Sequence, residues 1–341
     1  MRTALAALTL LLAAGAAFAG TVADASGRRL SLPPRVTRVY AAGPPASILV
    51  FAVAPDKLVG WTRALRPEEA AFLPPRYASL PVVGRLTGRG GTANLEVVLA
   101  SKPDLIVDSG STAPTYVSLA ERVQAQTGIP YALLDGHLGA VPTALRTLGR
   151  MLGDEARADR LAAYFERELN DIRRRVASVP QASRPTVYYG RGPDGLQTGG
   201  SRSINVEALK FLGARNVAAE VPAGLVTVPI EQVLLWDPQV ILTSDAEFWR
   251  NVRRDPRWQA VTAVSAHRVY LSPHLPFGWF DFPPGANRLI GLWWAGSKLY
   301  PEAFRVDLRA KVREFFGLFY HRVPSEAQID ALLGESGAPP R

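Results

Sequence analysis

Arginine and aromatic residues recur in the segments that separate short apolar runs of the chain, and both residue types can bind ligands. An arginine guanidinium is a rigid fork of donors that matches carboxylate, catecholate and oxoanion groups. Aromatic rings pack against the flat faces of a ligand. Small residues with free N–H groups, such as Gly199-Gly200-Ser201, complete the set. The residues expected to contact a ligand are Trp61, Arg63, Arg85, Arg89, Ser109, Tyr188, Tyr189, Arg191, Arg202, Phe277 and Trp279.

Metal-ligating residues are scarce. Cysteine is absent, so a disulfide framework, a thiolate metal site and a cysteine nucleophile are all excluded. The four histidines form no closely spaced pair of the kind that a bare zinc or manganese ion needs: His137, His267, His274 and His321. His137 and His274 could still reach one site, but a lone histidine is more often structural. We expect no cofactor and no bound bare ion.

Enzyme motifs give little support for catalysis. The chain has no G-x-S-x-G elbow, no phosphate-binding G-x-x-x-x-G-K-[ST] loop and no H-E-x-x-H pair. Gly190-x-Gly192-x-x-Gly195 has the spacing of a dinucleotide fingerprint, but Pro193-Asp194-Gly195 makes a turn where that fingerprint opens a helix. Asp108, Ser109 and His137 leave a hydrolase as the alternative from another class.

The N-terminus has the pattern of an export signal. Arg2 precedes an apolar run over 4–14, and Ala17-Phe18-Ala19 offers the small residues of a cleavage site before Gly20. The run is shorter than the roughly 20 residues that span a bilayer. Because a lipid-modified cysteine is impossible, we expect a free periplasmic protein of a Gram-negative cell.

Apolar periodicity predicts an α/β chain. Strands are expected at Val39–Ala41, Leu58–Trp61, Leu105–Asp108, Tyr131–Leu134, Thr186–Tyr189, Val240–Thr243 and Val269–Leu271, with helices between them. This alternation favours mainly parallel sheets. The net charge of +9 comes from scattered arginines with no basic run, so nucleic acid is not an expected partner.

One long helix is predicted between two such regions. From Asp154 to Val176, apolar residues recur every three or four positions: Leu161, Phe165, Leu169, Ile172 and Val176. It contains no glycine or proline, so we expect a rigid connection and modest closure between two lobes. The expected divisions are a signal peptide over 1–19, lobes over 20–143 and 181–333, a connecting segment over 144–180 and a loose tail over 334–341.

An internal repeat relates the two regions. Leu95-Glu96-Val97-Val98-Leu99 followed by Pro103-Asp104-Leu105-Ile106-Val107 recurs as Ile230-Glu231-Gln232-Val233-Leu234 and then Pro238-Gln239-Val240-Ile241-Leu242. The matching positions share one offset of 135 residues (231 − 96). Each copy predicts a short helix, a proline break and a buried strand, so the two lobes should have similar architecture.

At these residues the chain resembles the class III periplasmic binding proteins of ABC importers, a family that receives ferric siderophores, vitamin B12, haem and some metal or oxoanion species. The resemblance covers nearly the whole chain after residue 20 and implies two lobes with a ligand bound between them. It also implies that Glu96 and Glu231 dock onto arginines of a membrane permease; the alternative is that both are ordinary solvated helix residues.

The sequence leaves open which of that family's ligands this chain binds. Where vitamin B12 receptors carry cleft tryptophans, this chain has Gly90, Ser109 and Leu225, so a corrinoid is not favoured. The arginines and aromatics favour an anionic iron chelate of the siderophore type, and a molybdate- or tungstate-like oxoanion comes next. A third alternative is a partner-binding protein with a vestigial cleft. We expect a monomeric receptor without catalytic activity, with Phe277 and Trp279 against the ligand and Asp281 capping a helix opened by Pro283-Pro284.

Overall fold

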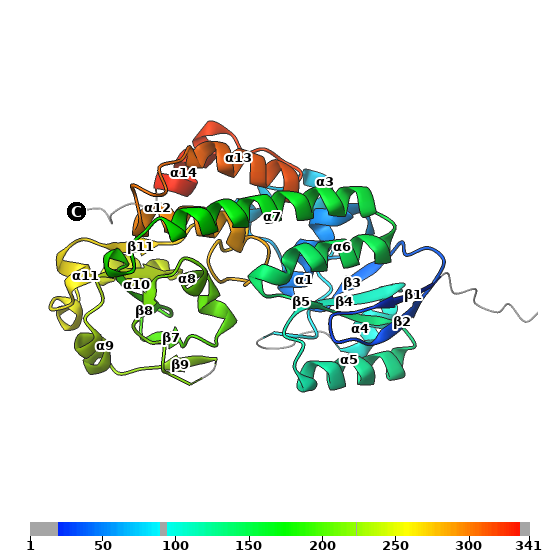
Figure 1. The fold of residues 1–341 in the computed structure, drawn as a ribbon. Coiled ribbons are helices and arrows are strands. Elements are labelled where there is room, and N and C mark those ends of the chain that lie inside the picture. The colour runs from blue at the N-terminus through cyan, green and yellow to red at the C-terminus, as the bar shows by residue number, and fades with distance from the viewer. Residues whose placement is uncertain (1–19, 89–93, 223, 335–341) are drawn as a thin grey trace, which may run out of the picture.

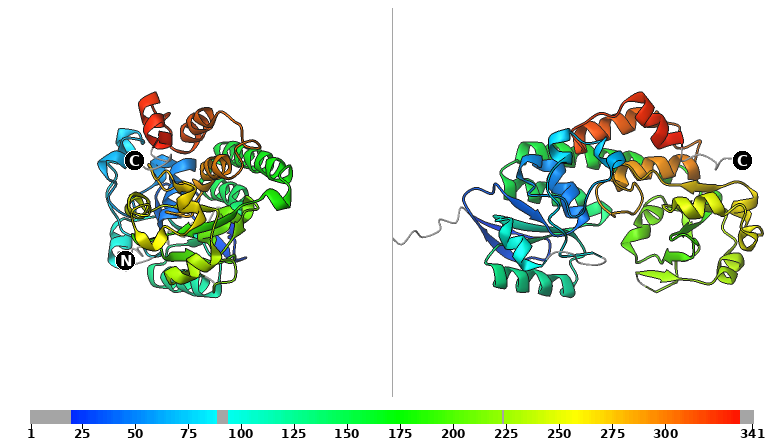
Figure 2. Two further views of the ribbon diagram at one scale, coloured as in Figure 1. Left: turned by 90° about the vertical axis from the view of Figure 1, so that its left-hand side faces the viewer. Right: turned by 180° about the vertical axis from the view of Figure 1, so that it is seen from behind.

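The computed structural model describes residues 20–88, 94–222 and 224–334. The expected signal segment 1–19, Arg89, Gly90 and residues 335–341 of the expected tail lie outside the described residues. Two α/β lobes stand next to each other beneath one long helix, as Figure 1 shows and as Figure 2 shows from behind.

The first lobe is built on a parallel sheet of order β3-β4-β5, formed by Val39–Ala41, Leu105–Gly110 and Tyr131–Asp135. Successive strand residues point to opposite faces. Val39, Leu105 and Val107 join the core formed with helices α1 (Pro44–Val53) and α6 (Val141–Leu152). Tyr40 and Ile106 join a separate core with α4 (Leu95–Ala100) and α5 (Pro114–Thr127). Burial on both faces explains the continuous apolar strands.

The second lobe repeats this plan. Its parallel sheet has the order β11-β10-β6-β8, formed by Val269–Leu271, Val240–Thr243, Thr186–Gly190 and Arg215–Asn216. Its faces are covered by α9 (Ile230–Trp236) and α10 (Ala246–Asn251) on one side and by α8 (Glu207–Phe211) and α12 (Arg288–Leu299) on the other.

Each lobe also carries one antiparallel pair of strands. The first lobe has β1 (Gly20–Ala23) with β2 (Arg29–Leu32), and the second has β7 (Gln197–Gly199) with β9 (Leu225–Thr227). The expectation of mainly parallel sheets is confirmed.

The repeat seen in the sequence occupies matching places in the two lobes. Each copy is a short helix followed by a residue of positive φ, a proline and the second strand of a sheet. The residues of positive φ are Lys102 (45°) and Asp237 (40°), which share the offset of 135 residues. A side chain rarely adopts this left-handed conformation, so its recurrence at matched positions shows that both lobes use the same tight connection.

Helix α7 (Glu155–Ala177) joins the lobes and matches the predicted helix within one residue at each end. The expected apolar stripe is buried: Leu161, Phe165, Leu169, Ile172 and Val176. Asp154 precedes the helix without capping it and instead pairs with Lys57, with Nζ 2.5 Å from Oδ2. In Figure 1 α7 crosses both lobes along one side of the molecule.

The C-terminal helices α13 (Leu308–Phe319) and α14 (Glu326–Gly334) lie over the junction of the two lobes in Figure 1. His321 and Arg322 contact first-lobe backbone, since His321 Nε2 lies 2.8 Å from Phe51 O and Arg322 Nη1 donates to Leu73 O at 2.9 Å. The end of the segment 181–333, which is expected to belong to the second lobe, therefore packs against the first lobe.

One expected strand is absent from the described sheets. Residues Leu58–Trp61 make only isolated bridges, Val39 with Leu58 and Trp61 with Val82. Trp61 is 2 % exposed, and its ring lies 5.3 Å from that of Phe51. Core packing therefore accounts for the apolar character of this segment, without a ladder of strand hydrogen bonds.

Candidate ligand-binding cleft

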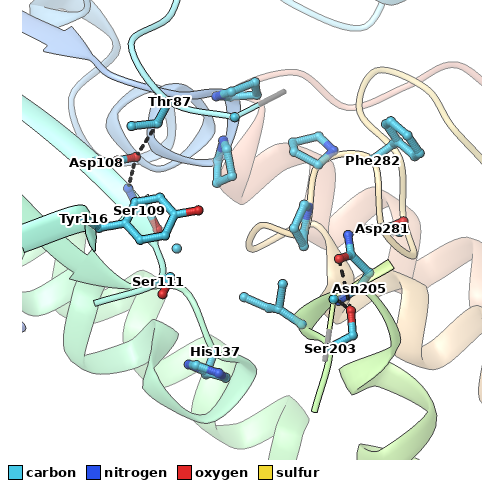
Figure 3. Close-up of a pocket in the computed structure, with 18 of the residues that line it drawn as sticks. Thr87, Asp108, Ser109, Ser111, Tyr116, His137, Ser203, Asn205, Asp281 and Phe282 are labelled. Atoms are coloured by element: carbon cyan, nitrogen blue, oxygen red, sulfur yellow. Dashed lines mark hydrogen bonds between the residues drawn. The ribbon is translucent and has the colours of Figure 1, made fainter. Parts of the chain in front are cut away.

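A cavity of about 480 Å³ lies between the lobes, where the carboxyl ends of the parallel strands face one another. Ligands of open α/β sheets bind at such strand ends. The first lobe contributes Pro44 and Pro45 after β3, Ser109 and Ser111 around the end of β4, and His137 after β5. The second lobe contributes Arg191 after β6, residues 202–205 and residues 281–284. Figure 3 shows Ser109, Ser111 and His137 on one side of the cavity and Ser203, Asn205 and Phe282 on the other.

Asp108 forms the polar floor on the first lobe. Thr87 Oγ1 donates to its Oδ1 at 3.0 Å, the Ser109 N–H donates to the same oxygen at 2.9 Å, and the Tyr131 hydroxyl donates to Oδ2 at 3.3 Å. The side chain has no arginine or lysine in ion-pair contact among the residues that the structure describes. Burial raises the pKa of Asp108, and the three hydrogen bonds only partly oppose this. The site therefore disfavours a negative charge on this floor.

Asp281 forms the floor on the second lobe together with Arg191. Arg191 Nε lies 2.6 Å from Asp281 Oδ2, and the residues are 6 % and 1 % exposed. Asn205 Nδ2 donates to Oδ1, and the Tyr189 hydroxyl donates to Oδ2 at 3.3 Å. Burial raises the pKa of Asp281, and Arg191 opposes the rise. The expected helix cap is wrong, because α12 begins at Arg288 and Asp281 is an ion-pair partner instead.

Two aromatic rings line the cavity, one from each lobe. Tyr116 on α5 is 37 % exposed, and Phe282 is 61 % exposed. The guanidinium of Arg191 lies 4.4 Å from the centre of the Phe282 ring, which is cation–π distance. Figure 3 shows the two rings on opposite sides of the cavity. A ligand with apolar faces could lie between them.

Four of the predicted ligand residues line this cavity: Arg85, Ser109, Arg191 and Arg202. Arg202 is exposed and has no carboxylate partner in the described part of the chain. His137 also lines it, with Nδ1 2.6 Å from Asp135 Oδ1.

Four others lie elsewhere, since Trp61, Tyr188, Tyr189 and Trp279 are at most 2 % exposed and do not line the cavity. Trp61 Nε1 donates to Tyr77 O at 2.8 Å, and Trp279 Nε1 donates to Leu275 O at 3.1 Å. The Tyr188 hydroxyl donates to Gly195 O at 2.9 Å, and the Tyr189 hydroxyl donates to Asp281 Oδ2 at 3.3 Å. These side chains are buried in the protein core, and their aromatic type alone does not distinguish core from cleft.

Arg63, Phe277 and His274 line an adjoining cavity of about 510 Å³ that shares Pro44, Arg85, Phe282 and Pro283 with the first. Arg63 is held by Glu69, with Nη1 2.7 Å from Oε2 and Nη2 2.8 Å from Oε1. Phe277 is 6 % exposed and packs against the rings of Trp61 and Tyr320. These residues border the cleft rather than the central cavity.

Tyr116, Phe282 and Asn205 line the cavity but are not predicted from the sequence. Phe282 precedes the Pro283-Pro284 pair, which predicts a helix start, but in the structure α12 begins at Arg288 and the pair lies in a loop at the cavity. Tyr116 lies in the first turn of α5, and a helix that follows a sheet strand at the cleft was the signal that could have found it.

The expected docking residues Glu96 and Glu231 are both exposed, on α4 of the first lobe and on α9 of the second. Both helices lie on the side of the molecule away from α7 (Figure 1). Among residues 20–88, 94–222 and 224–334, no cluster of three histidine or acidic side chains could hold a metal ion. In the same ranges no helix is long and apolar enough to span a membrane.

Comparisons with known proteins agree with this architecture. Residues 48–274 match the family model described as periplasmic binding protein. The solved structure of an ABC transporter solute binding protein from Sulfurospirillum deleyianum is 32 % identical, with a TM-score of 0.84, over 92 % of this chain and 99 % of that one. The molybdate-binding protein MolA of Haemophilus influenzae is 24 % identical over 88 % of this chain and 90 % of its own length. A vitamin B12-binding protein of Pectobacterium carotovorum is 29 % identical over 63 % and 70 %.

Two similar α/β lobes, one long connecting helix and a cavity between the strand ends define a ligand receptor of the two-lobed class. The chain belongs to the periplasmic binding protein family, whose members serve as the substrate-binding components of ABC transporters.

Proposed function

We propose that this protein is a periplasmic receptor that binds an anionic metal chelate between its lobes and releases it unchanged to an ABC permease. The observation that carries the proposal is the charge balance of the cavity. Asp281 pairs with Arg191, and burial disfavours the charged form of Asp108. Arg202 remains as a cation without a carboxylate partner among the described residues. Such a cavity favours an anion.

The size and lining of the cavity favour a chelate over a bare oxoanion. A volume of about 480 Å³ lies in the range of organic ligand sites. Tyr116 and Phe282 present exposed rings from opposite lobes, and aromatic rings gain little from a small hydrated ion. An iron complex of the siderophore type supplies both the negative charge and the apolar faces.

A molybdate- or tungstate-like oxoanion is the second candidate. The similarity to the molybdate-binding protein MolA extends over most of both chains and supports it. Arg191 and Arg202 could surround such an anion from one lobe, although Asp281 must then share Arg191. A smaller ligand would also require the lobes to approach more closely.

Delivery to a permease is proposed to use Glu96 and Glu231. Each glutamate lies beside exposed apolar side chains, Leu99 (48 %) on α4 and Leu235 (79 %) on α9. Exposed apolar residues around an exposed carboxylate are the composition of a transient protein interface, in which charge pairs fix orientation. With one such patch on each lobe, both lobes could contact a permease at once.

Catalysis is not part of the proposal. His137 Nδ1 lies 2.6 Å from Asp135 Oδ1, as a base and its orienting carboxylate would, but no serine hydroxyl bonds to the His137 ring among the described residues. A serine–histidine relay is therefore not supported by this geometry.

Thermal unfolding against a ligand panel tests the proposal. The panel holds ferric dicitrate, ferric catecholates, ferric hydroxamates, haem, cobalamin, molybdate, tungstate and divalent metal ions. A ligand at 100 times its dissociation constant adds about 2.7 kcal/mol to the free energy of unfolding. Stabilisation by an anionic iron chelate supports the proposal, whereas stabilisation by molybdate alone replaces the ligand. No stabilisation by any member contradicts the receptor function proposed here.

A further inference from the structure

A second cavity, of about 600 Å³, adjoins the cleft beneath α7. It shares four lining residues with the central cavity: His137, Arg202, Ser203 and Ile204. Figure 3 shows His137 and Ser203 together at one end of the central cavity, with Thr87 and Phe282 at the other. The second cavity therefore continues the cleft in one direction.

The second cavity is bordered by three cations. Arg173 projects from α7, Arg202 from the loop after β7, and Lys210 from α8. All three are exposed, and none has a carboxylate partner among the described residues. Arg173 donates to the neutral amide of Asn170 at 2.9 Å, and its guanidinium lies 4.9 Å from the centre of the Phe211 ring.

The carboxylate of Glu207 also lines this cavity but is already engaged. Its Oε2 lies 2.7 Å from Nη1 of Arg288, and the Leu138 N–H donates to the same oxygen at 3.0 Å. The buried Arg288 guanidinium balances the charge of Glu207, so this pair contributes no net negative charge to the cavity. Neighbouring Asp171 pairs with Arg174 and Arg175 on the same helix. None of the three cations is therefore paired with a carboxylate in this cavity, and an anionic group placed among them would be attracted to all three.

We propose that this second cavity is an anion subsite that takes a carboxylate or phosphate group of the ligand whose body fills the central cavity. The inference rests on the proposed function and narrows its substrate class to elongated ligands with two separated acidic regions. Phe211 and Ile204 supply apolar contact for the carbon atoms between those regions. A mononuclear oxoanion is too short to occupy both cavities.

Binding of two probes by calorimetry tests the subsite. Ferric dicitrate carries carboxylates around a metal core, and molybdate fills only one cavity. Arg173→Gln and Lys210→Gln should each weaken ferric dicitrate by about fivefold to tenfold and change molybdate affinity less than twofold. Arg174→Gln is the matched control, because Arg174 neighbours Arg173 but pairs with Asp171 and does not line the cavity. The proposal would be overturned if Arg173→Gln and Lys210→Gln bound ferric dicitrate as tightly as the Arg174→Gln control.

Acetylation of lysine tests the subsite independently of the central ligand. Citrate or inorganic phosphate should slow the acetylation of Lys210 several-fold in the wild type, at constant ionic strength, and Arg173→Gln should remove that protection. Exposed Lys102 is the internal control and should react at one rate throughout. If no panel ligand binds but citrate protects Lys210, the proposed function fails and the subsite stands. If a ligand stabilises the protein and neither citrate nor phosphate protects Lys210, the subsite fails alone.

Discussion

Arg191 and Asp281 form an ion pair at the floor of the cleft, with Nε 2.6 Å from Oδ2, and both side chains are almost completely buried. The pair belongs to one lobe, so it does not hold the cleft closed. It places a guanidinium at the cavity while the Asp281 carboxylate compensates its charge. A ligand anion must then compete with Asp281 for Arg191.

Asp281→Asn should separate stability from affinity. Loss of the carboxylate leaves the buried Arg191 charge without its partner, and the free energy of unfolding should fall by about 3 kcal/mol. Affinity for ferric dicitrate should rise, because the guanidinium no longer has an internal competitor. Chemical denaturation and calorimetry measure the two effects. Asp255→Asn, which removes the exposed pair with Arg257, is the control and should change neither.

Asp108→Asn should change the pH dependence of stability. Burial raises the pKa of Asp108 in the folded protein above the usual value of 3.8. The folded state therefore binds more protons than the unfolded state in the window above that value, and stability falls as pH rises through it. The amide removes this loss and can keep the bonds from Thr87 and Ser109. The variant should be more stable than the wild type at pH 7.5, with a difference that shrinks towards pH 4. A constant difference over this range would contradict the assignment.

Arg288→Met should weaken the contact between the lobes. Arg288 on α12 pairs with Glu207 of its own lobe and donates to Gly136 O of the other, while Glu207 accepts the N–H of Leu138. Removal of one buried partner should cost about 3 kcal/mol in the free energy of unfolding. The comparison is Arg146→Met, which removes a partly exposed pair with Glu166 and should cost less than about 1 kcal/mol. Similar losses in the two variants would show that Arg288 has no special role.

Reversal of charge at Glu96 and Glu231 tests permease docking. The double change Glu96→Arg and Glu231→Arg should abolish uptake into cells and leave ligand affinity unchanged, because both residues lie on exposed helices outside the cavity. Glu121→Arg, an exposed site on α5 of the first lobe, should leave uptake intact. Normal uptake by the double variant would remove the docking proposal without affecting the receptor.

The fold could be predicted from the sequence because its periodicities are local. The apolar stripe of α7 and the repeat around Glu96 and Glu231 each depend on neighbouring residues, and both recur in the structure at the expected places. Lys102 and Asp237 share a left-handed backbone conformation, so the repeat extends to the backbone. The sequence could not indicate this, because the two residues differ in type.

The cleft was predicted less well because its lining depends on which way each loop side chain turns. Trp61 and Trp279 have the residue type of ligand contacts, yet both are buried in packing inside the protein. Phe282 lies only three residues after Trp279 and is 61 % exposed at the cavity. Residue type alone cannot distinguish these outcomes, since an aromatic ring gains from burial in a core and from contact with a ligand alike.

Calorimetric titration with two iron complexes of similar size and different charge is the most direct test of the central claim, which is that the cleft selects anions. Ferric dicitrate should bind at one site per protein, and an uncharged ferric trihydroxamate should bind at least about tenfold more weakly. Arg202→Gln should reduce that preference, because Arg202 lines the central cavity and has no carboxylate partner in the described chain. Equal or tighter binding of the uncharged complex, or a preference that Arg202→Gln leaves unchanged, would contradict the account.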